Sequence, residues 1–448
     1  MRKRKLPKPG AAGAPSPVLS PHAAGDQQDI LRNWAGNLEY RTDTIHYPET
    51  VEEVQHLVKK YDRLKVLGSR HCFNRIADSQ DRFISLQRLQ QVVSLDAGAG
   101  TVTVEGGINY GQLSPYLHEK GYALPNLASL PHISVAGACA TATHGSGVKN
   151  SNLATTVAAF TFVAADGRVH ALSREKDGDT FWGAVVHLGA LGVITSMTLD
   201  IQPTYLVSQY VYEHLPMALL PDNFDQIVSA GYSVSLFTDW QSGSFGEVWV
   251  KVHEKEAAAW CARPEFFGAR AATANLHPII DMPPENCTGQ LGVPGPWHER
   301  LPHFRMGFTP SSGVELQSEY FVPHHHAVAA ILAVARLGKQ LGPLLLISEI
   351  RTIAPDKCWM SPACEQAAVA IHFTWKQDWP AVSRLLPVIE QELAPVQVKP
   401  PWGKLFALPP AVLRQRYKRM EDFKNLVSAY DPQGKFRNDF LNRHIFAV

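Results

Sequence analysis

The clearest chemical signal in the sequence is a pair of charges, Glu349 and Arg351, in a largely apolar run from Leu344 to Thr352. Side chains two residues apart on a strand point to the same face, so both charges would share one face of a mostly buried strand. His372 and Thr374 repeat this alternation further along the chain. Buried charges need partners, so the pair could be a structural ion pair, which is the commoner case, or part of a ligand site.

Two runs rich in small residues supply candidate backbone for an anion site. They extend from Gly68 to Asn74 and from Ser129 to Gly147, and neither is typical of regular structure. Small residues let main-chain N–H groups approach closely, so such runs can wrap a pyrophosphate without a basic residue. A pair of surface turns explains the spacing equally well. Lys404, after a Trp402-Gly403 turn, is a further charged candidate.

Several common cofactor and catalytic motifs are absent from the sequence. It contains no Gly-x-Gly-x-x-Gly after a strand, no Gly-x-x-x-x-Gly-Lys-Ser/Thr loop, no His-Glu-x-x-His and no Gly-x-Ser-x-Gly. A nicotinamide-dependent or nucleoside-triphosphate-dependent enzyme therefore lacks support. The six cysteines are scattered without a Cys-x-x-Cys pair, which argues against a zinc ribbon or a disulfide scaffold. We predict no metal site.

Composition and charge indicate a folded protein with a small partner. Of 448 residues, 45% are hydrophobic and 19% are charged, with a formal net charge of +1. Five basic residues lie in the first nine positions, and the rest of the chain carries a net charge of −4. Such a body lacks the positive field that gathers nucleic acid. No apolar run approaches the ~20 residues of a membrane span. We expect a monomer in the cytoplasm, without membrane contact.

Short strands and amphipathic helices predict an α+β fold. Thr50 can cap a helix, because Glu53 stands three residues on and an apolar face follows. We expect this helix to pack on one mixed sheet, whose strands would include residues 64–68, 83–86, 91–95 and 101–104. A helix over 110–120 and strands over 155–165 and 192–201 would complete this part.

The pattern changes after residue 203. Strands are expected over 206–211, 234–239, 247–252, 315–321, 344–352 and 368–375, and helices over 222–230, 324–338 and 379–393. We therefore expect four segments, which are a disordered extension (1–28), a first domain (29–203), a second domain (204–394) and a stretch that returns to the first domain (395–448). The last stretch is too short to fold alone.

Motifs throughout the chain resemble those of one flavoprotein family. They are Asn33-Trp34-Ala35-Gly36-Asn37, Gly68-Ser69-Arg70-His71, residues 124–137, 235–240 and 292–304, Glu349-Ile350-Arg351-Thr352, His372-Phe373-Thr374-Trp375, Trp402-Gly403-Lys404 and residues 431–436. In these motifs the sequence resembles the alditol (xylitol) oxidases of the vanillyl-alcohol oxidase superfamily. The resemblance implies a two-part FAD-binding domain (29–203 and 395–448) around an α+β substrate-binding cap (204–394).

The resemblance also implies FAD as the cofactor, bonded covalently through its 8α-methyl group to His71. The other residues that would contact FAD are Val66, Leu67, Gly68, Ser69, Arg70, Cys72, Ser129, Ser134, Gly137, Thr141, His144, Gly145, Val193 and Thr374. The sequence departs from the family pattern at Arg70, Cys72 and Pro401, where a small residue, a serine and a histidine are expected.

On the substrate side, the resemblance assigns polyol binding to Ser129, Glu349, Arg351, Thr374 and Lys404. A polyol is a row of hydroxyl groups that need donors and acceptors once water is excluded, and these side chains offer both. Arg351 and Lys404 would stabilise negative charge on the reacting oxygen, while Glu349 would accept from the inner hydroxyls. Lys404, Arg351 and Glu349 are therefore the expected catalytic residues.

The implied activity is oxidation of a CH–OH donor with oxygen as the acceptor. The enzyme would convert the terminal primary alcohol of xylitol, sorbitol or a related alditol to the aldose and form hydrogen peroxide. A sugar-lactone (aldonolactone) oxidase or dehydrogenase of the same superfamily is an alternative. A flavin-fold binding module without turnover is a second alternative, which the presence of Glu349, Arg351 and Lys404 disfavours.

Overall fold

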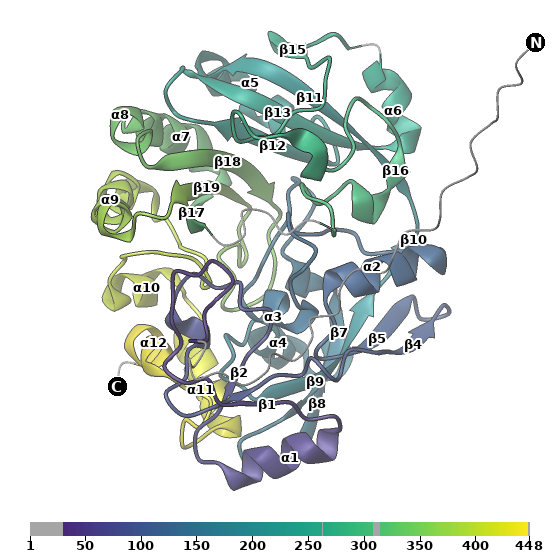
Figure 1. Ribbon diagram of the computed structural model, residues 1–448, viewed down its shortest axis with the longest axis vertical. Helices are drawn as coiled ribbons and strands as arrows, with labels where there is room; N and C mark the ends of the chain where they lie inside the picture. The colour runs from purple at the N-terminus through teal and green to yellow at the C-terminus, as the bar shows by residue number, and fades with distance from the viewer. Residues whose placement is uncertain (1–29, 262, 308–313, 447–448) are drawn as a thin grey trace, which may run out of the picture. The chain divides into compact units, whose positions relative to one another are not determined.

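The computed structural model of the protein describes residues 30–261, 263–307 and 314–446. Residues Leu31–Val448 form one compact unit, in which helices and strands alternate along the chain (Figure 1). The α+β class expected from the sequence is confirmed. The predicted extension over 1–28 lies outside the described residues. No helix in the described ranges is long and apolar enough to cross a membrane.

The first part of the chain forms separate sheets, so the expectation of one mixed sheet is wrong. A parallel sheet has the order β1-β3-β2, an antiparallel sheet has the order β4-β5-β9-β7-β8, and β6 pairs with β10. These strands are β1 (Ile45–His46), β2 (Lys65–Val66), β3 (Phe83–Ile84), β4 (Val92–Asp96), β5 (Thr101–Glu105), β6 (Tyr122–Ala123), β7 (Val157–Val163), β8 (Val169–Ser173), β9 (Val193–Asp200) and β10 (Gln202–Pro203). Strand β5 is paired on both sides and β4 is a largely exposed edge, so the two sheets do not join.

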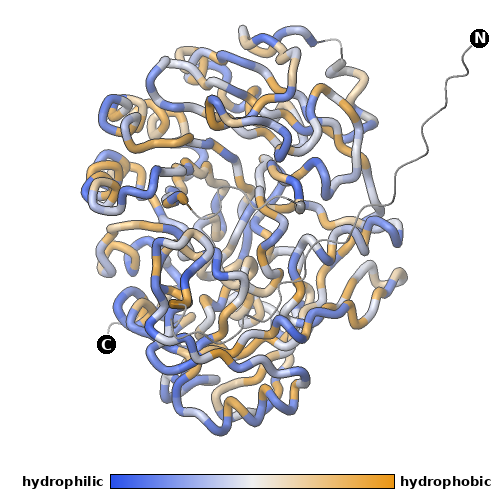
Figure 2. The backbone as a smooth tube through the Cα atoms, viewed as in Figure 1, coloured by the Kyte–Doolittle hydropathy of each residue, from blue (hydrophilic) through white to orange (hydrophobic). Residues whose placement is uncertain are grey.

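Four helices accompany these sheets. They are α1 (Val51–Lys60), α2 (Tyr110–Glu119), α3 (Val135–Ala140) and α4 (Arg174–Val185). Hydrophilic and hydrophobic residues alternate along α1 (Figure 2), and the Thr50 side chain accepts a hydrogen bond from the N–H of Glu53, as expected. Helix α3 lies in the second run of small residues, where no regular structure was predicted. Its alanines favour a helix, and its small side chains allow close packing.

A nine-stranded antiparallel sheet dominates the second part of the chain. Its order is β14-β15-β11-β13-β12-β18-β19-β17, and β16 pairs with β11. The strands are β11 (Leu206–Pro216), β12 (Ser233–Thr238), β13 (Ser244–His253), β14 (Glu265–Phe266), β15 (Ala269–Ala271), β16 (Gly295–Pro296), β17 (Glu315–Pro323), β18 (Leu345–Ile353) and β19 (Ala368–Lys376). The six strands predicted here from the sequence are therefore all present.

Helices cover one face of this sheet and leave the other face to the site. The helices of this part are α5 (Leu220–Val228), α6 (Glu254–Cys261), α7 (Ala327–Ala335), α8 (Gly338–Leu341) and α9 (Trp379–Glu392). Helix α5 contacts β12, and α7 contacts β17 and β19. Because side chains alternate along a strand, the polar positions His372 and Thr374 of β19 point away from the apolar positions Ile371 and Phe373.

The last part of the chain returns to the first strands. Helices α10 (Pro410–Arg416), α11 (Met420–Tyr430) and α12 (Asp439–Leu441) follow α9. The N–H of Leu64 donates to the Lys435 carbonyl at 3.1 Å, and the Lys65 ammonium donates to the Phe436 carbonyl at 3.0 Å. These bonds attach the C-terminal stretch to β2, which leads into the first run of small residues.

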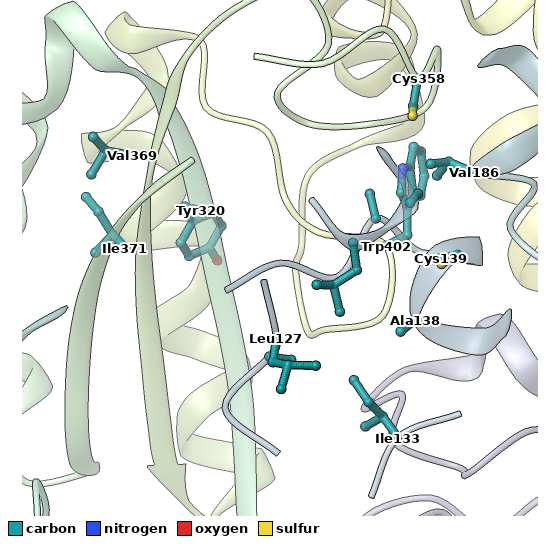
Figure 3. Packing of buried hydrophobic residues seen from close by; sticks show 14 of the residues in the cluster. Leu127, Ile133, Ala138, Cys139, Val186, Tyr320, Cys358, Val369, Ile371 and Trp402 are labelled. Atoms are coloured by element: carbon teal, nitrogen blue, oxygen red, sulfur yellow. The ribbon is translucent and has the colours of Figure 1, made fainter. Parts of the chain in front are cut away.

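The core fixes the turn that carries Lys404. Trp402 is fully buried in the same cluster as Val186, Cys139 and Cys358 (Figure 3), and its indole N–H donates to the Met360 carbonyl. The amide of Asn74 donates to the carbonyls of Trp402 and Lys404. The turn is therefore held between the core and the run that contains His71.

Candidate active site

One cavity of about 490 Å³ connects the two runs of small residues with the open face of the nine-stranded sheet. Most of the residues predicted from the sequence line it. They are Val66, Leu67, Gly68, Ser69, Arg70, His71, Cys72, Ser129, Ser134, Gly137, Thr141, His144, Glu349, Arg351, Thr374 and Lys404. Gly145 and Val193 are not among the lining residues, and Val193 is buried in a separate cluster with Val54 and Val58.

The sheet wall of the cavity is set by strand register. Phe237 of β12 pairs with Glu349 of β18, Glu349 pairs with His372 of β19, and His372 pairs with Glu319 of β17. Residues paired across neighbouring strands point to the same face. Four strands that are far apart in the sequence thus place one row of side chains along the cavity.

Glu319 is the centre of the charge network on this wall. Its side chain is fully buried, and its two oxygens contact the Arg351 guanidinium at 3.1 Å and the Lys404 ammonium at 2.9 Å. His144 and His372 approach the same carboxylate at 3.4 and 3.6 Å. Burial disfavours charge on Glu319, but Lys404 and His144 outweigh burial and hold its pKa well below the usual value. Glu319 therefore remains ionised and fixes both cations.

The sequence interpretation missed Glu319, although a signal for it was present. Glu315, Gln317 and Glu319 alternate along β17 as Glu349 and Arg351 alternate along β18. The same reasoning about side chains that share a face would have selected them. The pairing of β17 with β19 places Glu319 on this wall, and the bridge between Ser318 and Leu405 brings it beside Lys404.

Glu349 and Arg351 lie next to each other on the same wall, as predicted. Arg351 donates to Glu319 and contacts the Ser129 hydroxyl at 3.3 Å, and its Nε lies 3.5 Å from Glu349 Oε1. His303 Nε2 lies 2.8 Å from the same Oε1. Burial opposes ionisation of Glu349, but Arg351 and His303 outweigh it and hold the pKa of Glu349 well below its usual value.

Lys404 reaches the wall from its turn. Its ammonium bonds to Glu319 and lies 2.8 Å from His372 Nδ1, while His372 Nε2 lies 3.1 Å from the Thr374 hydroxyl. Burial lowers the pKa of Lys404, and Glu319 opposes that shift. Burial and Lys404 hold the pKa of His372 well below its usual value. A neutral His372 can accept from Lys404 and donate to Thr374.

His71 on the opposite wall has a different environment. Its ring stacks on Trp34 with centroids 5.1 Å apart, and neither ring nitrogen has a hydrogen-bond partner among the described residues. Burial and the neighbouring His132 lower the pKa of His71 to about 4. The imidazole is therefore neutral near pH 7 and keeps a lone pair free for a ligand.

Small residues shape the backbone on this wall. A Cβ atom on Gly68 would lie 2.7 Å from the Ser134 hydroxyl, and one on Gly137 would lie 2.5 Å from it. The N–H of Ser134 donates to the Ser69 hydroxyl at 3.1 Å. The two runs therefore contact each other at Gly68 and Ser134, where a larger residue than glycine would force the serine hydroxyl to move, and both runs line the cavity.

Two departures from the family pattern have distinct structural settings. Arg70 adopts a φ of +62°, a left-handed conformation that favours glycine, and its guanidinium donates to the Arg32 carbonyl. Cys72 is a half-buried free thiol beside Gly403, and burial raises its pKa to about 11.

Comparisons with known proteins identify the family. The profile of the FAD binding domain matches residues 42–173, and that of D-arabinono-1,4-lactone oxidase matches residues 314–444. An alditol oxidase from a Streptomyces species is 46% identical over 415 residues, which cover 92% of this chain and 98% of that protein. The chain belongs to the alditol oxidase family. The family resemblance read from the motifs is thereby confirmed.

More distant relatives share the fold of this alditol oxidase family member. An L-gulono-1,4-lactone dehydrogenase from Mycobacterium tuberculosis is 27% identical over 439 residues, covering 92% of this chain and 98% of its own. A solvent-stable cholesterol oxidase superposes with a TM-score of 0.73 at 15% identity, covering 93% of this chain and 97% of its own. The cholesterol oxidase from B. sterolicum also gives 0.73, at 13% identity, covering 97% of this chain and 100% of its own. The expected flavoprotein fold is confirmed.

Proposed function

We propose that this protein is an FAD-dependent oxidase that converts the terminal primary alcohol of an alditol, such as xylitol or sorbitol, to the aldose. Each turnover removes two hydrogens from the CH₂OH group and reduces one oxygen molecule to hydrogen peroxide. The observation that carries the proposal is the position of Glu349, Arg351 and Lys404 in the same cavity as His71. The identity to the Streptomyces alditol oxidase supports the choice of substrate.

The wall around His71 suits FAD. Among the described residues, neither buried ring nitrogen of His71 has a hydrogen-bond partner, and Gly68 and Gly137 keep the nearby backbone free of side chains, which leaves room for a large bound group. We expect the 8α-methyl group of FAD to be bonded to His71, and the small-residue runs to hold the pyrophosphate. Bound FAD supplies the electron acceptor that no side chain of the chain provides.

The sheet wall suits a polyol. Arg351 and Lys404 can donate to the hydroxyl that reacts and stabilise negative charge on its oxygen as the proton leaves. Glu349 can accept from an inner hydroxyl, and Ser129 and Thr374 can adapt as donors or acceptors. A substrate that lacks an inner hydroxyl would leave the Glu349 carboxylate unpaired, which selects for polyols.

The organisation of the chain follows from the same proposal. We assign residues 29–203 and 395–448 to the FAD-binding domain and residues 204–394 to the substrate-binding cap. The bonds of Lys435 and Phe436 to the residues of β2 support the return of the C-terminal stretch. We further propose a monomer in the cytoplasm.

Oxidation of a sugar lactone is the second candidate. The match of residues 314–444 to the lactone oxidase profile favours it, because this range includes Glu319, Glu349, Arg351 and Lys404. An aldonolactone also presents several hydroxyls to such a wall. Part of its carbon chain is closed into a ring, however, so it offers a shorter open row of hydroxyls to the alternating donors and acceptors than an alditol does.

Oxygen uptake separates the two candidates. Purified protein would be assayed with xylitol, sorbitol and an aldonolactone, with hydrogen peroxide measured in parallel. We expect uptake and equal peroxide with the alditols and little with the lactone, whereas the reverse ranking would reject the proposal. Acid precipitation tests the linkage, because flavin bonded to His71 stays with the pellet and His71→Ala releases it into the supernatant.

A further inference from the structure

A buried lysine that does not line the cavity is connected to Glu349 through His303. Lys251 of β13 is 1% exposed, and its ammonium contacts the carbonyls of Leu301 and Pro302 and the Nδ1 atom of His303. His303 Nε2 in turn lies 2.8 Å from Glu349 Oε1. Burying the charge of a lysine costs free energy. The contacts that lead from Lys251 through His303 to Glu349 therefore require an explanation.

The hydrogen bonds of Lys251 determine which ring nitrogen of His303 can carry a proton. Carbonyl oxygens only accept, so Lys251 uses two N–H bonds on Leu301 and Pro302. As an ammonium it has one N–H left, which points at His303 Nδ1 at 3.2 Å. Nδ1 must then be the unprotonated nitrogen, and the ring proton lies on Nε2, where it can be donated to Glu349.

The alternative arrangement moves one proton from Lys251 to His303 and leaves a neutral amine beside an imidazolium. Burial and Lys251 lower the pKa of His303 to about 4, while burial lowers the pKa of Lys251 only to about 7. These shifts favour Lys251 over His303 as the holder of the shared proton. Both arrangements carry the same net charge, so they differ in where the proton is held.

Packing holds the His303 ring in place, so the position of its ring proton is the main property that can vary. The ring lies between Phe237 and Trp249, with centroids 5.5 and 5.2 Å away, and its backbone N–H donates to the Ser129 carbonyl. The other oxygen of the carboxylate, Glu349 Oε2, takes part in none of the hydrogen bonds found among the described residues. It is therefore available to a ligand in the cavity that Glu349 lines.

We propose that Lys251 is a positioning residue that fixes the tautomer of His303, so that His303 Nε2–H holds Glu349 Oε1 and leaves Oε2 to accept a substrate hydroxyl. The proposal rests on the proposed polyol-binding function of this wall. Without the ammonium, His303 can place its proton on Nδ1 and turn a lone pair toward the Glu349 carboxylate. The carboxylate then loses its donor and is no longer held in place.

Nitrogen NMR of the holoprotein with ¹⁵N-labelled histidine reads the tautomer directly, with the His303 signals assigned by their loss in His303→Gln. We expect a neutral ring protonated on Nε2 in the wild type and a mixture of tautomers in Lys251→Met. A wild-type ring protonated on Nδ1, or on both nitrogens, would overturn the proposal even if Lys251→Met does not fold.

Kinetics supply the second readout. Glu349 contacts the substrate before and during the reaction, so Lys251→Met should raise KM for the alditol about 10- to 100-fold with a much smaller change in kcat. An unchanged KM in Lys251→Met would also overturn the proposal.

A control is Lys399→Met, which removes a partly buried lysine that bonds to the Pro362 carbonyl outside the cavity. Lys399→Met should leave KM and the His303 signal unchanged. If it raised KM as much as Lys251→Met does, the effect of Lys251→Met would be explained by a general loss of stability, and the proposal would fail. If the tautomer is as expected but no alditol is oxidised, the positioning by Lys251 is supported and the proposed function alone fails.

Discussion

The charged side chains of the sheet wall partner one another, whereas the ring nitrogens of His71 on the opposite wall have no hydrogen-bond partner in the described part of the chain. Glu319 pairs with both Arg351 and Lys404, and Glu349 lies beside Arg351 as a second carboxylate, while both nitrogens of His71 are buried and unbonded among the described residues. The difference shows how the two walls are built. Strand register holds the polar groups of the sheet wall against one another, whereas the wall around His71 is shaped by small residues and aromatic stacking.

The largest expected effect is at the centre of the sheet wall. Glu319→Gln removes the charge that Lys404 and Arg351 share, and leaving buried cations unpaired costs about 3–5 kcal/mol. We expect the free energy of unfolding in denaturant to fall by about that amount and activity to be lost. Glu285→Gln, on an exposed side chain, is the control. Wild-type stability in Glu319→Gln would mean that the network does not hold this wall.

Lys404→Met tests the chemistry of the same wall with less effect on folding, because part of the Lys404 side chain is exposed. Loss of one charged donor at a reacting oxygen lowers kcat by about 10²- to 10³-fold. Flavin content should not change, since Lys404 serves the substrate. Lys357→Met, on an exposed lysine, should retain full turnover. Unchanged turnover in Lys404→Met would show that the substrate binds elsewhere.

Gly137→Ala tests the wall around His71. The new Cβ would displace the Ser134 hydroxyl, which also contacts Gly68, and such overpacking costs about 1–3 kcal/mol. We expect a lower ratio of flavin to protein in the absorption spectrum, with the remaining loaded enzyme close to wild type in KM. Gly246→Ala, where a Cβ meets nothing closer than 4.0 Å, is the matched control. Equal flavin content in both variants would contradict a glycine-dependent cofactor wall.

The smallest expected effect concerns pH. His187 accepts a hydrogen bond from the N–H of Gly189, and burial, with Lys65 nearby, lowers the pKa of His187 to about 3. The unfolded chain binds a proton below about pH 6.5 and the folded protein does not, so stability falls as the pH is lowered from 6.5 toward 3. Between pH 7 and 5 this residue should cost about 2 kcal/mol.

Thermal unfolding at several pH values measures this slope. His187→Asn should flatten it, while the exposed His56→Asn should not. A slope that is the same in His187→Asn and wild type would mean that His187 is protonated in the folded protein.

The sequence predicted the sheet wall in part, because alternation alone reveals residues that share a face. Glu349, Arg351, His372 and Thr374 were found in this way. Glu319 was not found, since its role depends on the pairing of β17 with β19. Lys251 and His303 lie on a strand and a loop that no local pattern connects.

The wall around His71 was predicted mainly through family motifs. Local patterns left the small-residue runs undecided between an anion site and surface turns, because tertiary contacts decide which backbone faces a cavity. The same contacts made α3 a helix within a run that lacked apolar periodicity. The expected mixed sheet is split into separate sheets because of the way its strands pair. Short strands do not specify their partners, so the sequence did not reveal this pairing.

Anaerobic addition of xylitol to the purified yellow protein tests the central claim most directly, because it requires the cofactor wall and the sheet wall to act on one molecule. We predict that xylitol bleaches the visible absorption of the flavin, that air restores the colour with formation of hydrogen peroxide, and that Lys404→Met bleaches far more slowly. Protein that keeps its colour with xylitol and sorbitol but is bleached by an aldonolactone would contradict the account.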